Sequence, residues 1–140
     1  MTNENNVTSA SPDGEVTLDI LPVDNDTPTD DTAQPQVAVI TIRRDHKRNS
    51  LNADVCSQIA TYVHEAENTE SVRAILLRGE GKAFCAGADL AGGVYTSAFH
   101  HNLDAVLTSI THSPFPVIAD VHGPAVGAGT QLAMACDLLV

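Results

Sequence analysis

The chain has 140 residues, of which 43% are hydrophobic, and its formal net charge is −11 at pH 7. That length fits one domain with enough apolar side chains for a core. The acidic balance argues against nucleic acid or an anionic membrane as a partner. No apolar stretch reaches the length of a membrane span and no basic-then-apolar signal region opens the chain, so we expect a cytoplasmic protein without membrane contact.

The first 35 residues differ in composition from the rest of the chain. Eight of the 18 acidic residues lie in residues 1–35, which contain no Lys or Arg and are rich in Asn, Thr, Pro and Ser. An apolar stretch over 16–23 has the partial alternation of an edge strand, but the residues around it favour disorder. We therefore predict a disordered acidic arm over residues 1–35 and a folded domain over residues 36–140.

Apolar periodicity predicts alternating strands and helices after the arm. The run over 37–42 is β-branched and typical of a strand, and Val55 and Ile59 begin a helical repeat behind the N-cap residue Asn52. The expected order is strand 37–42, a helix after Asn52, strand 74–77, a helix over 99–110, strand 116–121, a short helix over 132–135 and strand 137–140. This order predicts an α/β protein with a mostly parallel sheet.

The three cysteines, Cys56, Cys85 and Cys136, are odd in number and far apart in the sequence. None belongs to a Cys-x-x-Cys pair, and the Glu and His residues lack the spacing of a metal site, so no bound metal is expected. We expect each cysteine to be a small buried hydrophobic residue.

Two stretches of small residues follow predicted strands, one over 84–89 and the other over 123–129. Such turns let backbone amides approach a ligand closely, and two amides that converge on one oxygen form an oxyanion hole. Tight packing of a helix against a neighbour is the alternative explanation for the small residues. A nucleotide site has little support, because residues 79–82 lack the spacing of a phosphate-binding loop.

The residues over 82–90, 122–129 and 132–137 together resemble the enoyl-CoA hydratase/isomerase family, also called the crotonase family. Residues 48–52 are similar to the first CoA-contact loop of that family, and the match runs over residues 37–140. The resemblance implies a crotonase-like spiral of ββα units, here truncated before the C-terminal helical region, and a homotrimer or hexamer at full length. It also implies acyl-CoA or enoyl-CoA as substrate or ligand, with no separate cofactor.

The resemblance further implies which residues form the site. Catalytic roles fall on the amides of Ala86 and Ala128, as oxyanion donors, and on the position of Gln131. The implied CoA-binding residues are Lys47, Arg48, Ser50, Leu51, Ala86, Gly87, Ala88, Asp89 and Gly127. From the residues alone, Asp89 is expected to cap the following segment or hold its loop, and His122 to act as a cap or face solvent.

Gln131 leaves the catalytic activity open. Hydratases of the resembled family have a glutamate at this position, whereas a glutamine orients a water or a carbonyl but does not exchange protons near neutral pH. The leading hypothesis is an acyl-CoA-binding, hydratase/isomerase-like protein of fatty-acid metabolism that stabilises a thioester oxyanion on two backbone amides.

Two alternatives stand beside this hypothesis. One is a non-catalytic acyl-CoA binder or carrier in fatty-acid or mycolic acid metabolism, since the residues around Gln131 resemble actinobacterial family members that lack the first catalytic glutamate. The other is that the 140-residue chain does not function by itself, because it holds half of an acyl-CoA site and an open sheet edge.

Overall fold

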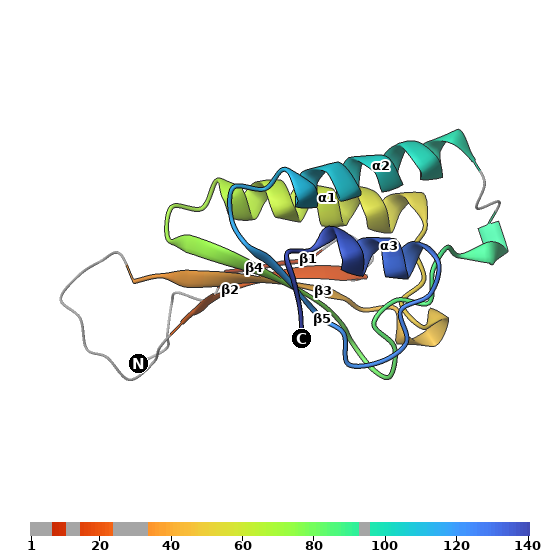
Figure 1. The fold of residues 1–140 in the computed structure, drawn as a ribbon, viewed down its shortest axis with the longest axis horizontal. Coiled ribbons are helices and arrows are strands. Elements are labelled where there is room, and N and C mark those ends of the chain that lie inside the picture. Colours follow the sequence, from red (N-terminus) through yellow and green to blue (C-terminus); the bar gives the residue numbers. More distant parts are fainter. Residues whose placement is uncertain (1–6, 11–14, 24–33, 93–95) are drawn as a thin grey trace.

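A computed structural model describes residues 7–10, 15–23, 34–92 and 96–140 of the protein. These residues form one six-stranded sheet whose strand order across the sheet is the same as the order along the chain. Figure 1 shows the helices α1, α2 and α3 on one side of this sheet. The elements are β1 Val7–Ala10, β2 Val16–Pro22, β3 Gln36–Ile42, η1 Asp45–Lys47, α1 Ala53–Glu67, β4 Val72–Gly79, η2 Leu90–Gly92, α2 Ser97–Thr111, β5 Val117–Asp120, α3 Ala128–Ala135 and β6 Leu138–Leu139.

The predicted α/β architecture is confirmed from β3 onwards. Strands β3, β4, β5 and β6 pair in parallel, and a helix connects each strand to the next. The predicted N-cap is also present, because the Asn52 side chain accepts a hydrogen bond from Val55 N–H at 2.8 Å. The helical repeat after it buries one face of α1, as the apolar spacing predicts.

The prediction of a disordered arm is wrong for β2. This strand pairs antiparallel with β3 along its whole length, from Val16 opposite Ile42 to Pro22 opposite Gln36. Its alternate residues Val16, Leu18 and Ile20 are buried, so the period-2 pattern outweighs the acidic composition around it.

The folded unit therefore begins before residue 36. Strand β1 continues the sheet beyond β2, with Val7 opposite Ile20 in an antiparallel pair. The other parts of the predicted arm, residues 1–6, 11–14 and 24–33, lie outside the described residues.

The prediction of buried cysteines is confirmed for Cys56 and Cys85 and is wrong for Cys136. Cys56 and Cys85 are buried and Cys136 is half-buried, and all three thiols are free. Burial raises the pKa of the Cys56 thiol to about 12 and that of the Cys85 thiol to about 11, so both stay protonated near neutral pH. Within the described residues, no helix is both long enough and apolar enough to cross a membrane.

Candidate functional site

The two predicted small-residue turns lie against each other at the ends of β4 and β5. Phe84 and Cys85 each donate a backbone hydrogen bond to Pro124 O at 3.1 Å, and Val126 N–H donates to Cys85 O at 3.0 Å. These bonds form an isolated parallel bridge between Cys85 and Ala125. The turns meet because the carboxyl ends of neighbouring parallel strands emerge at the same edge of a sheet.

Gly87 allows a close approach between the two turns. Its φ of +102° lies in a region that side chains disfavour, and a Cβ atom here would sit 2.8 Å from Val126 O. The same hypothetical atom would lie 3.7 Å from Ala128 N, so the Gly87 backbone is next to the start of α3. The glycine thus brings the peptide between Gly87 and Ala88 close to the Ala128 amide.

The prediction that Ala86 N–H is a ligand donor is wrong in this geometry. Ala86 N–H donates to Arg48 O at 3.0 Å and therefore faces the loop after η1. The sequence pattern marks a run of small residues over 84–89, but it does not say which N–H group in this run points towards residues 123–129.

Ala88 has the amide orientation that was expected of Ala86. Leu51 N–H donates to Gly87 O, and Asp89 N–H donates to Leu51 O, both at 2.7 Å. A trans peptide points its C=O and N–H in opposite directions, so Ala88 N–H points away from Leu51. Within the described part of the chain, no group accepts a hydrogen bond from Ala88 N–H.

Ala128 supplies a second backbone N–H group without an acceptor among the described residues. It is the first residue of α3, where helical N–H groups have no partner inside the helix. None of the described residues accepts Ala128 N–H, whereas Gly129 N–H donates to Val126 O at 2.9 Å. The positive end of the α3 dipole lies at the same place and favours a negatively polarised oxygen. Gly127, with φ 56°, sets the direction in which the helix begins.

Gln131 lies in the first turn of α3 and is exposed. Its backbone N–H donates to Gly127 O at 3.1 Å, which closes that turn. The side chain is therefore anchored three residues beyond Ala128, on the helix that carries the second amide.

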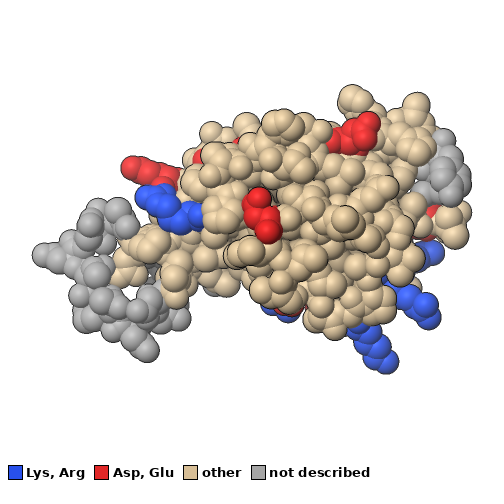
Figure 2. Space-filling model, viewed as in Figure 1, with Lys and Arg blue, Asp and Glu red and all other residues tan. Residues whose placement is uncertain are grey.

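The basic loop after β3 divides into exposed and buried parts. Lys47 and Arg48 are exposed, whereas Ser50 and Leu51 are buried. Figure 2 shows Lys and Arg side chains at the corner where η1 and the turn after β4 lie in Figure 1. Of the predicted CoA-contact residues, Lys47 and Arg48 can meet an anionic ligand with their side chains, while Leu51 acts through its backbone bonds to the Gly87 turn.

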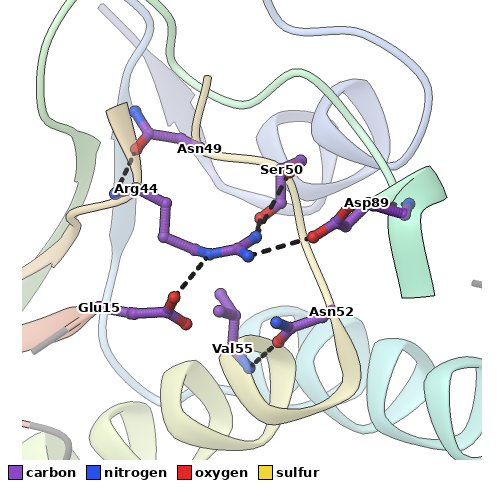
Figure 3. Close-up of polar contacts among 8 residues, drawn as sticks. Glu15, Arg44, Asn49, Ser50, Asn52, Val55 and Asp89 are labelled. Carbon is purple, nitrogen blue, oxygen red and sulfur yellow. Dashed lines mark hydrogen bonds and ion pairs between the residues drawn. The ribbon is translucent and has the colours of Figure 1, made fainter. Parts of the chain in front are cut away.

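Arg44 is the residue of this loop that sequence reasoning missed. Its guanidinium is buried and lies between the carboxylates of Glu15 and Asp89, each at 3.1 Å (Figure 3). A signal was present in the sequence, because Arg44 follows Ile40 and Ile42 at the two-residue spacing that places side chains on the same face of a strand.

Asn49 fixes the same loop from the other side. It is fully buried, and its backbone has the left-handed φ of 57°. The Asn49 side chain accepts Arg44 N–H at 2.9 Å and donates to Glu80 O and Ala83 O, both at 2.8 Å. The loop after β3 is thereby tied to the turn that leads into residues 84–89.

Asp89 holds its loop, as expected from the residues alone. One carboxylate oxygen accepts Ala91 N–H at 3.0 Å and the other accepts Arg44 Nη2. These two bonds hold the pKa of the Asp89 carboxyl below its usual value. His122 is exposed, and its Nε2 lies 2.7 Å from Gly81 O.

Comparison with known proteins identifies the family of the chain. The sequence model of the family described as enoyl-CoA hydratase/isomerase matches residues 32–140. A Mycobacterium tuberculosis protein named probable enoyl-CoA hydratase echA6 is 40% identical over 109 residues, which make up 78% of this chain and 44% of that protein. A probable enoyl-CoA hydratase of Rhodobacter capsulatus is 37% identical over 109 residues, with 74% of this chain and 42% of the relative covered. The chain thus spans less than half the length of these relatives.

Solved structures show the same fold. An enoyl-CoA hydratase/isomerase family protein from Hyphomonas neptunium has a TM-score of 0.75 and 32% identity, covering 89% of this chain and 46% of its own. An enoyl-CoA hydratase/carnithine racemase from Magnetospirillum magneticum has a TM-score of 0.76 and 25% identity, covering 94% of this chain and 46% of its own. With the family match over most of its length, the chain belongs to the enoyl-CoA hydratase/isomerase family.

Proposed function

We propose that the amides of Ala88 and Ala128 bind the carbonyl oxygen of an acyl-CoA thioester. The observation that supports this most directly is that both N–H groups lack an acceptor among the described residues while their turns are bonded together. When a thioester enolises or its conjugated double bond is attacked, negative charge develops on the carbonyl oxygen. Two fixed donors stabilise that charge, and the loss of one such donor lowers turnover about 100-fold or more.

The basic corner supports an acyl-CoA ligand. Lys47 and Arg48 are exposed, and the backbone carbonyl of Arg48 accepts Ala86 N–H, which links these two residues to the turn over 84–89. The phosphates of coenzyme A are anionic and would be attracted there, although the chain as a whole carries a net charge of −11. In this proposal Gly87, Ala88, Asp89 and Gly127 shape the thioester end of the site, and no further cofactor is needed.

The proposed chemistry is that of a hydratase or isomerase acting on fatty acyl-CoA. From the family resemblance we also expect a cytoplasmic homotrimer or hexamer. Gln131 favours a second candidate, a non-catalytic acyl-CoA binder or carrier. Its exposed amide lies one turn into α3 and can orient a water or a carbonyl, but it does not take up a proton.

Proline substitutions test the two amides. Ala128→Pro removes the N–H at the first position of a helix, where proline is tolerated, and Ala128→Gly changes the side chain but keeps the N–H. Ala88→Pro and Ala88→Gly form the same pair in the other turn.

The measurement compares the affinities for butyryl-CoA and for S-butyl-CoA, a thioether in which a methylene replaces the carbonyl. We expect the wild type and both glycine variants to prefer the thioester, and both proline variants to lose that preference. A wild type that binds the thioether as tightly as the thioester would refute the proposed function.

A separate assay distinguishes the two candidates. Hydration of crotonoyl-CoA removes the absorbance of its conjugated thioester. Loss of that absorbance with wild-type protein supports the enzyme, whereas binding without turnover supports the carrier. In the second case, Gln131→Glu tests whether this position limits proton transfer.

A further inference from the structure

Arg44 lies at the centre of a buried polar network that joins three distant segments of the chain. Its Nε donates to Glu15 Oε1 and its Nη2 to Asp89 Oδ2, both at 3.1 Å, while Nη1 donates to the carbonyl oxygen of Ser50. Nη1 also lies 3.3 Å from Ser50 Oγ. Only 5% of the Arg44 side chain is accessible, so the guanidinium has little room to reach a ligand.

The guanidinium holds both segments of the parallel bridge between Leu51 and Ala88. Ser50 directly precedes Leu51, and Asp89 directly follows Ala88. Figure 3 shows Ser50 and Asp89 at one end of the guanidinium and Glu15 at the other. A planar group with donors in fixed directions sets the spacing and the register of the two segments at the same time.

We infer that Arg44 is a positioning residue for the Ala88 amide, an inference that rests on the proposed function. Gly87 C=O and Ala88 N–H belong to the same planar peptide group. The bond from Leu51 N–H to Gly87 O therefore also sets the direction of Ala88 N–H. That bond depends on the register between the two segments of the bridge. Arg44 therefore acts on the thioester oxygen through Ser50 and Asp89 and not by contact.

Glu15 extends this role to the N-terminal part of the sheet. It lies one residue before β2, and its carboxylate accepts the Arg44 Nε at 3.1 Å. With Asp89 it places two carboxylates around one buried cation, which lowers the cost of burying that charge. Glu15 thus belongs to the support of the site, although it lies 73 residues before Ala88 in the sequence (88 − 15).

The experiment uses Arg44→Lys and Arg44→Met, with Arg43→Met as the matched control. Arg43 is the preceding residue and also contacts the N-terminal part of the sheet, through Thr17 Oγ1 at 3.0 Å. The other side-chain partner of Arg43 is Glu80 at 3.2 Å, and among the described residues the Arg43 side chain makes no bond to Ser50 or Asp89. The affinities for butyryl-CoA and S-butyl-CoA are measured for each folded variant, together with the infrared carbonyl band of bound butyryl-CoA.

We expect both Arg44 variants to lower the preference for the thioester over the thioether about tenfold, which corresponds to about one hydrogen bond. The carbonyl band of the bound thioester should move back towards its position in water, while the affinity for the thioether changes little. Arg43→Met should keep both the preference and the band position. A loss of general stability alone would lower both affinities together and leave their ratio unchanged.

The possible failures are distinguishable. If wild type prefers the thioester and the Arg44 variants keep that ratio and band position, the inference is overturned and the proposed function stands. If wild type shows no preference, the proposed function fails and the inference fails with it. Arg44→Lys keeps the positive charge. If Arg44→Met does not fold, the affinity ratio and the carbonyl band of Arg44→Lys are sufficient to test the inference.

Discussion

Arg44 Nη2 lies 3.1 Å from Asp89 Oδ2, although 45 residues separate the two in the sequence. This ion pair connects the end of β3 to the turn that follows β4. Its buried guanidinium is neutralised from a second side by Glu15. The pair therefore makes the geometry of the candidate site depend on a segment whose acidic composition predicts disorder.

Replacing Glu15 tests whether the start of β2 is bound as described. Glu15→Gln removes one charge from a pair in which the Arg44 side chain is 5% and the Glu15 side chain 22% accessible. We expect the free energy of unfolding to fall by about 1.5–3 kcal/mol, the range for a hydrogen bond to a charged group. The measurement is urea unfolding, with Glu70→Gln as the control because Glu70 is exposed. Equal midpoints for the two variants would contradict the described contact.

Asn49→Asp tests the tie between the loop after β3 and residues 80–83. The aspartate keeps the shape and the acceptor, but it loses the two N–H donors to Glu80 O and Ala83 O. The carbonyls of Glu80 and Ala83 would then face a carboxylate, so we expect a loss of about 2–5 kcal/mol in the free energy of unfolding.

Asn52→Asp is the control for that substitution. Asn52 caps α1 with its side-chain oxygen, and an aspartate caps a helix N-terminus equally well. Urea unfolding should give this control a stability close to that of the wild type. A similar loss in both variants would mean that the buried amide of Asn49 has no special role.

Much of the fold follows from the sequence because it rests on local periodicity. The face of α1 that begins with Val55 and Ile59 is buried as predicted, and residues 37–42 form a strand as predicted. The arm prediction failed because composition averages over a long window, whereas Val16, Leu18 and Ile20 need only alternate over a few positions to form a strand.

The site is less predictable for a geometric reason. In an extended segment the N–H groups of residues two apart face the same side, so the difference between Ala86 and Ala88 depends on the positive φ of Gly87 between them and on which residues of another loop they meet. That loop is reached through Leu51 and Arg48, and no property of the small residues themselves encodes these partners.

The Asp89 ion pair predicts a pH dependence of stability. The bond from Ala91 N–H, and then that from Arg44, lower the pKa of Asp89 in the folded protein. The carboxylate therefore adds stability above its unfolded pKa of about 3.9, and this contribution is lost as the pH falls through the lower, folded value. The difference in the free energy of unfolding between wild type and Asp89→Asn should be constant near neutral pH and shrink below about pH 4. A difference that stays the same down to pH 2.5 would contradict this linkage.

Gly87→Ala and Gly127→Ala separate crowding from backbone strain. Both glycines have positive φ, 102° and 56°, so both substitutions incur the backbone cost. A Cβ at Gly87 would also lie 2.8 Å from Val126 O, whereas a Cβ at Gly127 meets nothing within 4 Å. We expect Gly87→Ala to be less stable than Gly127→Ala by about 1–3 kcal/mol, the usual cost of overpacking, in urea unfolding. Equal losses would show that the two turns can move apart without cost.

The buried thiols predict slow chemical modification and lower stability in alkali. Desolvation raises the pKa of Cys56 to about 12 and that of Cys136 to about 12, so their stabilising contribution is complete below the unfolded thiol pKa and declines above it. Iodoacetamide at pH 8 should label the three cysteines far more slowly in the native protein than in urea. The free energy of unfolding should fall above about pH 8.5, and less so in Cys56→Ala. Labelling at the same rate with and without urea would contradict the described burial.

The order of the strands has a consequence for how the protein is made. Because each strand pairs with the one just before it in the chain, the sheet can grow in the order in which the ribosome releases the polypeptide. Among the described strands each pairs with its predecessor in the chain, so the loop that closes each new pairing is short for a parallel sheet. The antiparallel pair of β1 and β2 would then form first and β3 would join it, and these three strands would be the template to which β4, β5 and β6 are added during synthesis.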